Sequence, residues 1–500
     1  MLKQISRSDK INKLGIIIFE KKKYKLKTKN ELLEFENLYS LLKNIIRRKY
    51  AGYSFYADFK LLTVYEEFIK NKRHFKSIKS NAGKFNSKVN FIYFKYRPAN
   101  KTFWSIGISE IFDLLRMDAK KICDLIPLES NKINKFYYAV YKFFSEFSHG
   151  VGNQISISTV ALKIYRKFFQ EKSLIGHSQE AEKVIREAYA GGRCEILQFN
   201  VHKGYYYDIN SLYPFVMCGD MPFGLSFHTK HYVKDLMGFY HCKVHVPENM
   251  RISPLWKKTD KGLIFPVGNF YNTYASCEIE NAINNGCEVE IIDGYFFAGR
   301  EKLFEVFMKG FYERKRHARA DGDLFSENIY KLMLNTFSGK WAIQREQKEI
   351  FEFKTLQEFI DSKAVDLSDK VRIAERKSIS KSKYIIPAIS AWTTAQGRVV
   401  LWDWLVKVGI EDNLFYFDND AFVTNQELPT SDKLGDIKLV AQFENAKFHM
   451  DKDYEMTVIE NGNKIGKIEK MKGGKRLKDS LYKKRRIFGN ITKPIILKEF

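Results

Sequence analysis

The sequence predicts an α+β fold in which strands that end in acidic residues flank helical segments. Residues 205–207 are three consecutive tyrosines, which are typical of a strand, and Asp208 follows them directly. A second apolar strand leads into Asp418 and Asp420. Between these strands, residues 301–342 carry apolar side chains at helical spacing, which predicts a helical hairpin.

The size and charge of the chain predict a large globular protein with a polyanionic partner. At 500 residues it is long enough for about two to four domains. A hydrophobic content of 45% excludes a disordered chain. The net charge of +25 favours nucleic acid as the partner. The alternative is a lysine-rich composition inherited from an AT-rich genome.

Cysteine and apolar patterns predict a protein of the reducing cell interior. The six cysteines form no C-x-x-C pair, and a chain of this size needs no disulfide framework. We see no signal peptide and no apolar run of about 18 residues, so we expect neither secretion nor a membrane partner. His241, Cys242 and His245 lie in an expected strand at 239–246, where a structural role is more common than a metal site.

Further elements follow from local patterns. Strands are expected at residues 14–19, 90–94, 195–199, 414–417 and 421–424. Residues 202–204 end in a glycine and are expected to form a turn before the tyrosine strand. A helix is expected at 385–408, since Pro387 lies near its start and Gly409 follows its end.

The second helix of the hairpin is expected to have one apolar and one polar face. A turn at 320–323 precedes it. The apolar stripe consists of Ile329, Leu332, Met333, Thr336 and Phe337. Lys331, Asn335 and Ser338 recur on the other face, so Lys331 is expected to lie exposed beside Asn335.

Asp208, Asp418 and Asp420 are the candidate metal ligands. Two Mg²⁺ ions about 4 Å apart must be held by carboxylates from separate strands, so that one activates the attacking oxygen and the other steadies the leaving phosphate. Two aspartates in a surface turn are a common alternative for a single D-x-D. The surface-turn alternative becomes less common once the same chain also has Asp208 at the end of another strand. The two segments together therefore indicate nucleotidyl transfer.

Several other residues suit a nucleic-acid enzyme. Arg319 and Lys331 are candidates to grip the β- and γ-phosphates of a triphosphate, although basic neighbours make Arg319 weak evidence by itself. Tyr213 is either a ring that packs against the sugar and excludes a 2′-hydroxyl or a core tyrosine. The basic runs at 472–476 and 483–486 form either a solvated tail or a clamp on the nucleic-acid backbone.

Six motifs, in this order, resemble those of family B DNA polymerases, specifically the protein-primed branch of phages and linear plasmids. They are Tyr189-x-Gly191-Gly192; Asp208-x-x-Ser211-Leu212-Tyr213-Pro214, similar to motif A; Lys331-x-x-x-Asn335-Thr336-Phe337-Ser338-Gly339, similar to motif B; Thr394-x-x-Gly397-Arg398; Tyr416-x-Asp418-Asn419-Asp420, similar to motif C; and Lys452-x-Tyr454. Together they cover residues 189–454, so the resemblance is specific.

The resemblance implies a right-hand polymerase and a role for each motif. Asp208, Asp418 and Asp420 would be catalytic and would bind two Mg²⁺ ions, for which Mn²⁺ can substitute. The implied nucleotide-binding residues are Ser211, Leu212, Tyr213, Arg319, Lys331 and Asn335. The implied DNA-binding residues are Tyr189, Gly191, Gly192, Thr394, Arg398, Lys452 and Tyr454.

The resemblance also implies a domain order. The expected domains are a degenerate RNase H-like exonuclease domain at 1–185, a palm with an insertion of the protein-primed type at 186–300, a fingers hairpin at 301–345, the second part of the palm at 346–450 and a basic thumb at 451–500.

The chain departs from the family pattern in motifs B and C. Thr336 and Ser338 stand where the family has Ser and Tyr, and Asn419 and Ala421 stand where Thr and Ser are usual. The tyrosine replaced by Ser338 lines the nucleotide pocket in the family, so this change bears on fidelity and sugar selection. Neither change in motif C removes a metal ligand.

The N-terminal region departs further. A 3′–5′ exonuclease needs four carboxylates from three motifs. Residues 53–58 have the placement of the second motif, but Tyr53 stands where Asn is usual and Ala57 where an aromatic residue is usual. Tyr137-x-x-x-Tyr141 has the form of the third motif with Tyr in place of Asp. We also find no convincing D-x-E at the right distance before the second motif. Loss of two or more of the four carboxylates should abolish hydrolysis, so we expect no proofreading.

The expected function is DNA-directed DNA synthesis on a linear phage or plasmid-like genome. The expected partners are template and primer DNA, dNTPs and a terminal protein whose hydroxyl starts the chain, with the enzyme itself a monomer. A bacterial or host cell interior is the expected location, and a mitochondrial plasmid is compatible with it. The alternatives are a template-independent or ribonucleotide-tolerant polymerase and a non-catalytic DNA-binding replication factor.

Overall fold

The computed structural model describes most of the chain. The described residues are 14–46, 54–57, 80–82, 91–96, 104–110, 115–126, 130–147, 156–260, 262–343, 345–352, 355, 357, 360, 365–366, 373–380, 385–471 and 485–500. The chain forms two compact units. The first comprises Met1–Gln170, Glu313–Phe337 and Gln344–Ser382, and the second comprises Glu171–Tyr312, Ser338–Ile343 and Lys383–Phe500.

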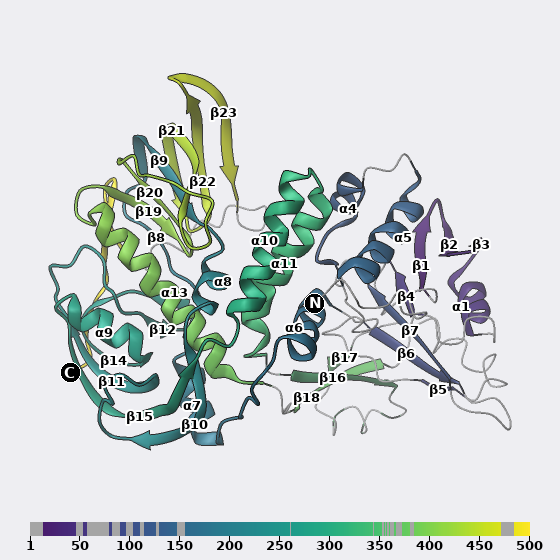
Figure 1. Ribbon diagram of the computed structural model, residues 1–500, viewed down its shortest axis with the longest axis horizontal. Coiled ribbons are helices and arrows are strands. Elements are labelled where there is room, and N and C mark those ends of the chain that lie inside the picture. The colour runs from purple at the N-terminus through teal and green to yellow at the C-terminus, as the bar shows by residue number, and fades with distance from the viewer. Residues whose placement is uncertain are drawn as a thin grey trace. The chain divides into compact units, whose positions relative to one another are not determined.

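The first unit contains a mixed sheet whose described strands have the order β3-β2-β1-β4-β7-β6-β5 (Figure 1). The strands are β1 (Leu14–Glu20), β2 (Lys23–Thr28), β3 (Leu32–Phe35), β4 (Ser54–Ala57), β5 (Ser80–Ala82), β6 (Phe91–Tyr96) and β7 (Trp104–Glu110). The central strands β1, β4 and β7 run parallel. Parallel strands are buried on both faces, and Ile16, Ile17 and Ile18 of β1 are indeed fully buried.

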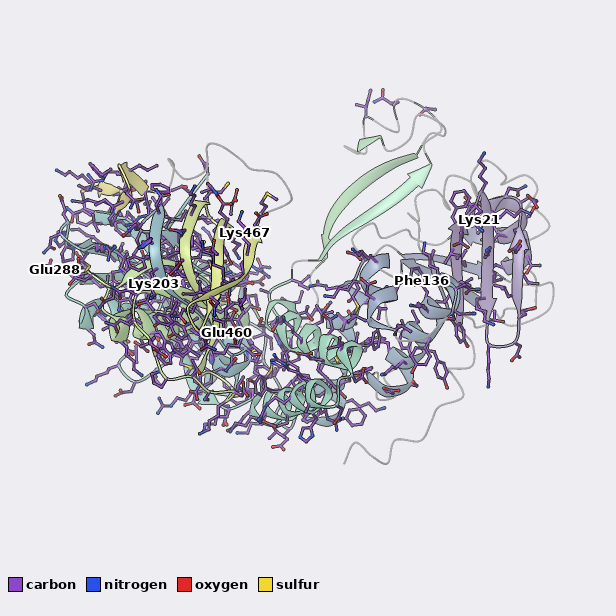
Figure 2. The ribbon with its side chains drawn as sticks, turned by 90° about the horizontal axis from the view of Figure 1, so that it is seen from above. Lys21, Phe136, Lys203, Glu288, Glu460 and Lys467 are labelled. Carbon is purple, nitrogen blue, oxygen red and sulfur yellow. The ribbon has the colours of Figure 1, made fainter. Side chains whose placement is uncertain are left out.

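Helices accompany this sheet. They are α1 (Leu38–Ile46), α4 (Ala119–Leu125), α5 (Lys132–Lys142), the π-helical turn η4 (Phe143–Phe147) and α6 (Ile157–Phe168). Helix α5 packs against β1 and β2 and buries Phe136 (Figure 2). Asn131 caps this helix by accepting a hydrogen bond from the backbone N–H of Asn134 at 3.1 Å. A smaller sheet of β16 (Arg345–Glu352), β18 (Ile373–Ser380) and β17 (Val365–Asp366) belongs to the same unit.

The second unit contains the antiparallel sheet that carries the three candidate carboxylates. Its order is β23-β22-β21-β9-β20-β19-β8 (Figure 1). The strands are β8 (Cys194–Ile196), β9 (Asn200–Ile209), β19 (Leu414–Asp418), β20 (Ala421–Thr424), β21 (Ile437–Met450), β22 (Asp453–Glu460) and β23 (Asn463–Lys470). Residues two apart on a strand share a face. Tyr206 and Asp208 therefore lie on the same face of β9, and Tyr206 joins a core of buried aromatic residues.

A second sheet of this unit has the order β10-β15-β11-β14-β26. Its strands are β10 (Met221–Thr229), β11 (Gly238–Val246), β14 (Val267–Ala275), β15 (Glu288–Glu301) and β26 (Ile496–Lys498). The unit also contains two hairpins, β12 (Lys257–Thr259) with β13 (Gly262–Ile264) and β24 (Arg485–Phe488) with β25 (Ile491–Pro494). Trp256, Tyr240 and Tyr274 are buried in its core. Strand β26 runs parallel to β14, so residues 496–498 join this sheet.

Helix α13 (Pro387–Val408) organises the second unit. It contacts α7 (Gln179–Glu187), α8 (Leu212–Met217) and α9 (Ser276–Asn284) (Figure 1). Because it is surrounded on several sides, most of its residues are buried. Pro387 lies in its first turn, and Gly409 ends it with a φ of 91°. The helix expected at 385–408 is therefore confirmed.

The helical hairpin expected between the carboxylates is also confirmed. It consists of α10 (Glu305–Ala320) and α11 (Leu324–Lys340). Gly322 adopts a φ of 72° in the turn, a conformation that glycine permits. Asp323 caps α11 through the N–H of Ser326 at 3.1 Å. Its other carboxylate oxygen lies 2.7 Å from the ammonium of Lys142 on α5.

The expected turn at 202–204 is wrong, because β9 continues through these residues. Lys203 pairs with Glu444 and Gly204 with Phe443 on β21. Lys203 is visible on this sheet (Figure 2). A β-carbon at Gly204 would lie 2.7 Å from the carbonyl oxygen of Thr424. The glycine thus permits close strand packing rather than a turn.

Other strand expectations are confirmed with small shifts in their ends. The strands at 14–19, 90–94 and 239–246 correspond to β1, β6 and β11. The six cysteines are free thiols, as expected. No helix in the described ranges is long and apolar enough to cross a membrane.

Candidate active site

Three neighbouring strands bring the candidate carboxylates to one end of the central sheet. Asp208 on β9 pairs in register with Ala421 on β20. Asp418 ends β19 and pairs with the same alanine across the β19–β20 hairpin. Asp420 lies in the turn of that hairpin. Two segments about 210 residues apart in sequence therefore meet, as we expected for carboxylates that follow two separate strands.

The turn between β19 and β20 is held by backbone hydrogen bonds on both sides. The N–H of Asp420 donates to the carbonyl of Asp418 at 2.6 Å, and the carbonyl of Asp420 accepts from the N–H of Ile209 at 2.6 Å. The N–H of Asn419 donates to the carbonyl of Arg193 at 2.6 Å. Asn419 has a φ of 54°, which asparagine tolerates better than most residues.

The glycine pair of the Tyr189 motif has a steric role at this turn. A β-carbon at Gly192 would lie 2.1 Å from Oδ1 of Asn419, whereas a β-carbon at Gly191 would meet nothing within 4 Å. Only Gly192 is therefore required for the close approach. Tyr189 itself is half-buried, and this burial raises the pKa of its hydroxyl.

The three carboxylates repel one another in a partly desolvated place. Asp418 is 3% exposed. Burial, followed by the charges of Asp208 and Asp418, raises the pKa of Asp420 to about 6. A site that holds like charges this close favours binding of a cation.

Lysines already supply positive charge to these carboxylates. The ammonium of Lys438 lies 2.5 Å from Oδ1 of Asp208. Those of Lys452 and Lys470 lie 3.1 Å and 3.6 Å from the two oxygens of Asp418. Lys452 was a candidate DNA-binding residue, whereas Lys438 and Lys470 were missed, because only the strand register reveals that they meet the carboxylates.

The three aspartates have the chemistry of an Mg²⁺ site, because Mg²⁺ prefers hard oxygen ligands such as carboxylates. Within the described ranges, no three Asp, Glu, His or Cys side chains already stand at the spacing of a metal site. The ammonium of Lys452 is near Oδ1 of Asp418 without forming a well-aligned hydrogen bond, so this buried oxygen is left unsatisfied. Asp208, Asp418 and Asp420 could therefore hold metal ions once lysine side chains move aside.

Tyr213 lies in α8, directly after the motif A strand. A β-carbon at Gly397 of α13 would approach its ring to 3.0 Å, so this glycine makes room for the tyrosine. Burial raises the pKa of the Tyr213 hydroxyl to about 12. Ser211 precedes the helix with a φ of 53°, and Leu212 is buried. Contacts of these residues with a nucleotide stay predictions.

Arg398 makes protein contacts that its motif did not suggest. It is 8% exposed, and its Nε donates to Oε1 of Glu278 at 2.9 Å. Its Nη1 donates to the carbonyls of Ala190 at 3.0 Å and Gly191 at 2.6 Å. Arg398 thus positions the backbone that leads to Gly192, and its contact with DNA stays a prediction. Glu278 was missed, since it lies 120 residues from Arg398 in sequence.

Two further candidate DNA-binding residues are buried. Thr394 donates to the carbonyl of Ala391 in its own helix at 3.1 Å. Tyr454 is 3% exposed, and its hydroxyl donates to that of Tyr206 at 3.1 Å. Its ring stands 5.6 Å from that of Tyr416. Both residues support the site from the core, and their contacts with DNA stay predictions.

The candidate triphosphate residues lie on the helical hairpin and belong to the first unit. Arg319, Lys331 and Asn335 are exposed, as expected. Ser338 does not share their exposed face, because it is 7% exposed and its carbonyl accepts a hydrogen bond from Ser390 at 2.5 Å. The expected polar face is therefore correct for Lys331 and Asn335 and wrong for Ser338.

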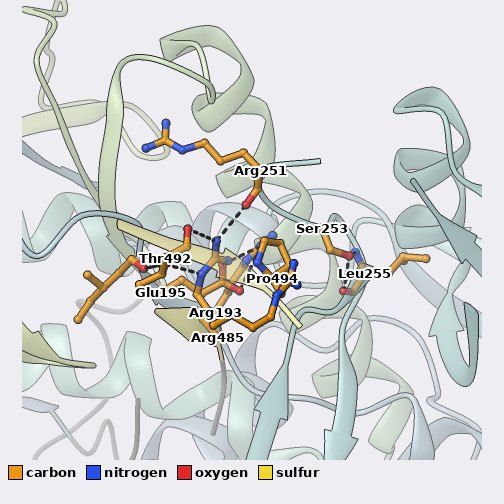
Figure 3. Close-up of polar contacts among 10 residues, drawn as sticks. Arg193, Glu195, Arg251, Ser253, Leu255, Arg485, Thr492 and Pro494 are labelled. Atoms are coloured by element: carbon orange, nitrogen blue, oxygen red, sulfur yellow. Dashed lines mark hydrogen bonds and ion pairs between the residues drawn. The ribbon is translucent and has the colours of Figure 1, made fainter. Parts of the chain in front are cut away.

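A buried charge network supports the site from β8 (Figure 3). The guanidinium of Arg193 lies 4.0 Å from the ring centre of Phe265 and 3.3 Å from Glu195. Glu195 also accepts from Arg485 at 2.6 Å, and Arg485 donates to the hydroxyl of Thr492 at 2.7 Å. Burial lowers the pKa of Arg193 to about 10. The network therefore connects the β24–β25 hairpin to Arg193, and the carbonyl of Arg193 holds the Asn419 turn.

The expected thumb at 451–500 stays a prediction. Within it, β22 and β23 extend the sheet that carries Asp208, and Figure 2 shows Glu460 and Lys467 on this extension. Most of the two basic runs, residues 472–476 and 483–484, lies outside the described residues.

The degenerate exonuclease motifs can be located in part. Tyr137 and Tyr141 lie on α5, where their rings stack with centres 6.2 Å apart. Ala57 is buried at the end of β4, whereas Tyr53 and Asp58 lie outside the described residues. Loss of nuclease activity stays a prediction.

Known proteins resemble the chain in sequence. The family model for DNA polymerase type B, organellar and viral, matches residues 3–396. A probable DNA polymerase of Podospora anserina is 28% identical over 378 residues, which are 64% of this chain and 30% of that protein. The DNA-directed DNA polymerase of Enterobacteria phage PRD1 is 25% identical over 293 residues, which are 57% of this chain and 51% of that protein. The chain thus matches only about 30% and 51% of the length of these two relatives.

Solved structures resemble the chain in fold. Phi29 DNA polymerase, in a complex with primer-template DNA and incoming nucleotide substrates, has a TM-score of 0.73 at 17% identity, and the match covers 94% of this chain and 93% of that one. This likeness confirms the expected α+β polymerase fold. Because the family model matches well over half of the sequence, the chain belongs to the DNA polymerases of type B, organellar and viral.

Proposed function

We propose that this chain catalyses DNA-directed DNA synthesis with Asp208, Asp418 and Asp420 as its metal ligands. The observation that supports this most directly is the convergence of the three carboxylates at adjoining strands. Burial there, followed by the charges of Asp208 and Asp418, raises the pKa of Asp420 to about 6. A protein that only binds DNA gains nothing from holding like charges together. The non-catalytic alternative is therefore disfavoured.

In the proposed reaction, the 3′-hydroxyl of the primer attacks the α-phosphate of a dNTP and pyrophosphate leaves. Two Mg²⁺ ions, when bound, activate the hydroxyl and stabilise the charge on the phosphates. The doubly hydrogen-bonded turn fixes Asp418 and Asp420 relative to β9, so the carboxylates need little reorganisation. Tyr213 is proposed to contact the sugar, and Arg319 and Lys331 to bind the triphosphate.

Primer extension tests this proposal. Purified wild type should extend a labelled primer on a defined template with four dNTPs and Mg²⁺. Asp420→Ala should lose activity by several orders of magnitude, whereas Asp260→Ala, an exposed aspartate in the β12–β13 turn, should match wild type. Equal extension by wild type and Asp420→Ala would reject the proposed site. Reactions without template, or with rNTPs, separate a templated DNA polymerase from the template-independent and ribonucleotide-tolerant alternatives.

We also propose that synthesis starts on a terminal protein. In this step a Ser, Thr or Tyr hydroxyl oxygen attacks the α-phosphate of the first dNTP, forms a phosphodiester bond and releases pyrophosphate. The sheet built from β10, β11, β14 and β15 occupies the residues where the protein-primed insertion was expected. All three carboxylates come from one chain, so the proposed site needs no second copy, and we propose a monomer as the active form. A labelled dNMP joined covalently to the partner protein, and absent with Asp420→Ala, would support this proposal.

The N-terminal domain is proposed to lack proofreading, because Tyr141 stands where a carboxylate is needed. Incubation with 3′-labelled single-stranded DNA and Mg²⁺ should release no more labelled mononucleotide from wild type than from Asp58→Ala. Greater release from wild type would overturn this part of the proposal.

A further inference from the structure

Lys438 forms an ion pair with a proposed metal ligand. Its ammonium nitrogen lies 2.5 Å from Oδ1 of Asp208. The sheet register places Lys438 on β21 directly opposite Asp208 on β9. Because side chains opposite one another in an antiparallel pair project from the same face, the strand pairing itself brings the two groups together.

The lysines around the site balance its carboxylates. Lys438 pairs with Asp208, whereas Lys452 and Lys470 pair with Asp418. A divalent cation on these carboxylates would stand within a few ångströms of the ammonium groups, and the repulsion would oppose its binding. At least one ammonium group therefore has to move when such a cation binds.

Lys438 has the geometry of the group that moves. It has the shortest of the three pairs, so it covers a carboxylate oxygen most completely. Its side chain is 43% exposed and can swing into solvent. Lys470 is equally exposed, at 44%, but its ammonium also lies 5.5 Å from the ring centre of Tyr454. The side chain of Lys452 is less exposed, at 33%.

We propose that Lys438 is a resident counter-ion of Asp208 that Mg²⁺ displaces, so that this lysine weakens metal binding until a polyanion draws its ammonium group away. The inference rests on the proposed function, because it takes Asp208 as a metal ligand.

Metal and nucleic acid then assist one another. A phosphate that captures the Lys438 ammonium frees Oδ1 of Asp208 for the metal, and a metal on Asp208 frees the ammonium for a phosphate. The coupling is reciprocal, because each ligand favours the same arrangement of the lysine. The reacting partners thus assemble together.

Binding of Mn²⁺, followed by the loss of the free-ion signal in electron paramagnetic resonance, tests this without measuring catalysis. Lys438→Ala should bind Mn²⁺ about 2- to 5-fold more tightly than wild type, the range expected for loss of a half-exposed ion pair. Lys447→Ala removes an exposed lysine from the same strand and should match wild type. Lys438→Arg keeps the charge and should stay close to wild type. Asp420→Asn measures how much Mn²⁺ binds to the protein outside the proposed metal site.

A second titration with primer-template DNA tests the coupling. After subtraction of the Asp420→Asn signal, DNA should raise the Mn²⁺ affinity of wild type more than that of Lys438→Ala. If Lys438→Ala does not fold, Lys438→Gln replaces it with the same expected tightening.

The possible failures are distinguishable. Equal or weaker Mn²⁺ binding by Lys438→Ala than by Lys447→Ala overturns the role of Lys438, while the metal site itself stands. Equal Mn²⁺ binding by wild type and Asp420→Asn instead overturns the proposed metal site, and with it the proposed function.

Discussion

Gly192 lies so close to Asn419 that no β-carbon fits between them. A β-carbon at Gly192 would lie 2.1 Å from Oδ1 and 2.6 Å from Cγ of Asn419. Asn419 is the central residue between the two aspartates of motif C, and its N–H is held by Arg193. Gly192 of the Tyr189-x-Gly191-Gly192 motif therefore leaves room for the Asn419 side chain in the turn that carries Asp418 and Asp420.

We expect Gly192→Ala to reduce primer extension by about 100-fold, because a displacement of about 1 Å in the catalytic geometry has effects of that size. Overpacking should also lower the free energy of unfolding by about 1–3 kcal/mol. Gly191→Ala is the matched control, since a methyl group there meets nothing within 4 Å. Extension rates and urea melts of both variants measure this. Equal rates for the two variants would show that the turn adapts to the methyl group.

Asp420→Asn should stabilise the protein at neutral pH in the absence of divalent metal. Burial and the neighbouring aspartates raise the pKa of Asp420 from 3.8 to about 6 in the folded state. Above pH 6 Asp420 is ionised in both states, but the charged form is less stable in the folded protein than in the unfolded chain. This lowers the free energy of unfolding by roughly 3 kcal/mol. Below about pH 4 both states hold the neutral acid, and the cost disappears.

Thermal melts of wild type and Asp420→Asn in EDTA, from pH 4 to pH 8, test this prediction. The melting temperature of the variant should exceed that of wild type at pH 8, and the difference should shrink as the pH falls. Excess Mg²⁺ should raise the melting temperature of wild type more than that of the variant. A difference that does not depend on pH would contradict the assigned cause.

Glu278→Ala should destabilise the protein by about 3–5 kcal/mol, because it leaves the buried guanidinium of Arg398 without its ion-pair partner. Glu278 is 2% exposed and also accepts a hydrogen bond from the indole N–H of Trp256 at 2.9 Å. Glu288→Ala removes an exposed carboxylate and should have little effect. Guanidinium titrations compare the two. Restored stability in Glu278→Gln would mean that hydrogen bonds, rather than charge, carry the contribution of Glu278.

The parts of the site that sequence reasoning found share a local signature. Asp208, Asp418 and Asp420 follow apolar strands, and a strand end places a polar side chain at the edge of a sheet. Helix α13 was found because Pro387 and Gly409 mark its ends. Such signals depend only on a few neighbouring residues, so they can be read without knowledge of the fold.

The residues that sequence reasoning missed depend on distant pairing. Lys438 meets Asp208 only through the register of β21 with β9, and Glu278 meets Arg398 across 120 residues. The turn expected at 202–204 failed for the same reason. Gly204 resembles a turn residue locally, yet it serves the close approach of Thr424. Tertiary packing overrides a local preference wherever it buries enough backbone to compensate.

The C-terminal hairpin should support catalysis through Arg485, although it contributes no proposed ligand. Arg485 is 3% exposed and pairs with Glu195, which also holds Arg193. Arg485→Ala should therefore leave Glu195 with Arg193 as its remaining partner in this network and destabilise the protein by about 1–3 kcal/mol. The adjacent, exposed Arg486 offers a matched control, because Arg486→Ala removes the same charge from the same strand. The Arg193 carbonyl anchors the Asn419 turn, so Arg485→Ala should also lower the rate of primer extension, measured at temperatures where the variant is still folded. Equal losses of rate in Arg485→Ala and Arg486→Ala would instead point to a general effect of charge on DNA binding.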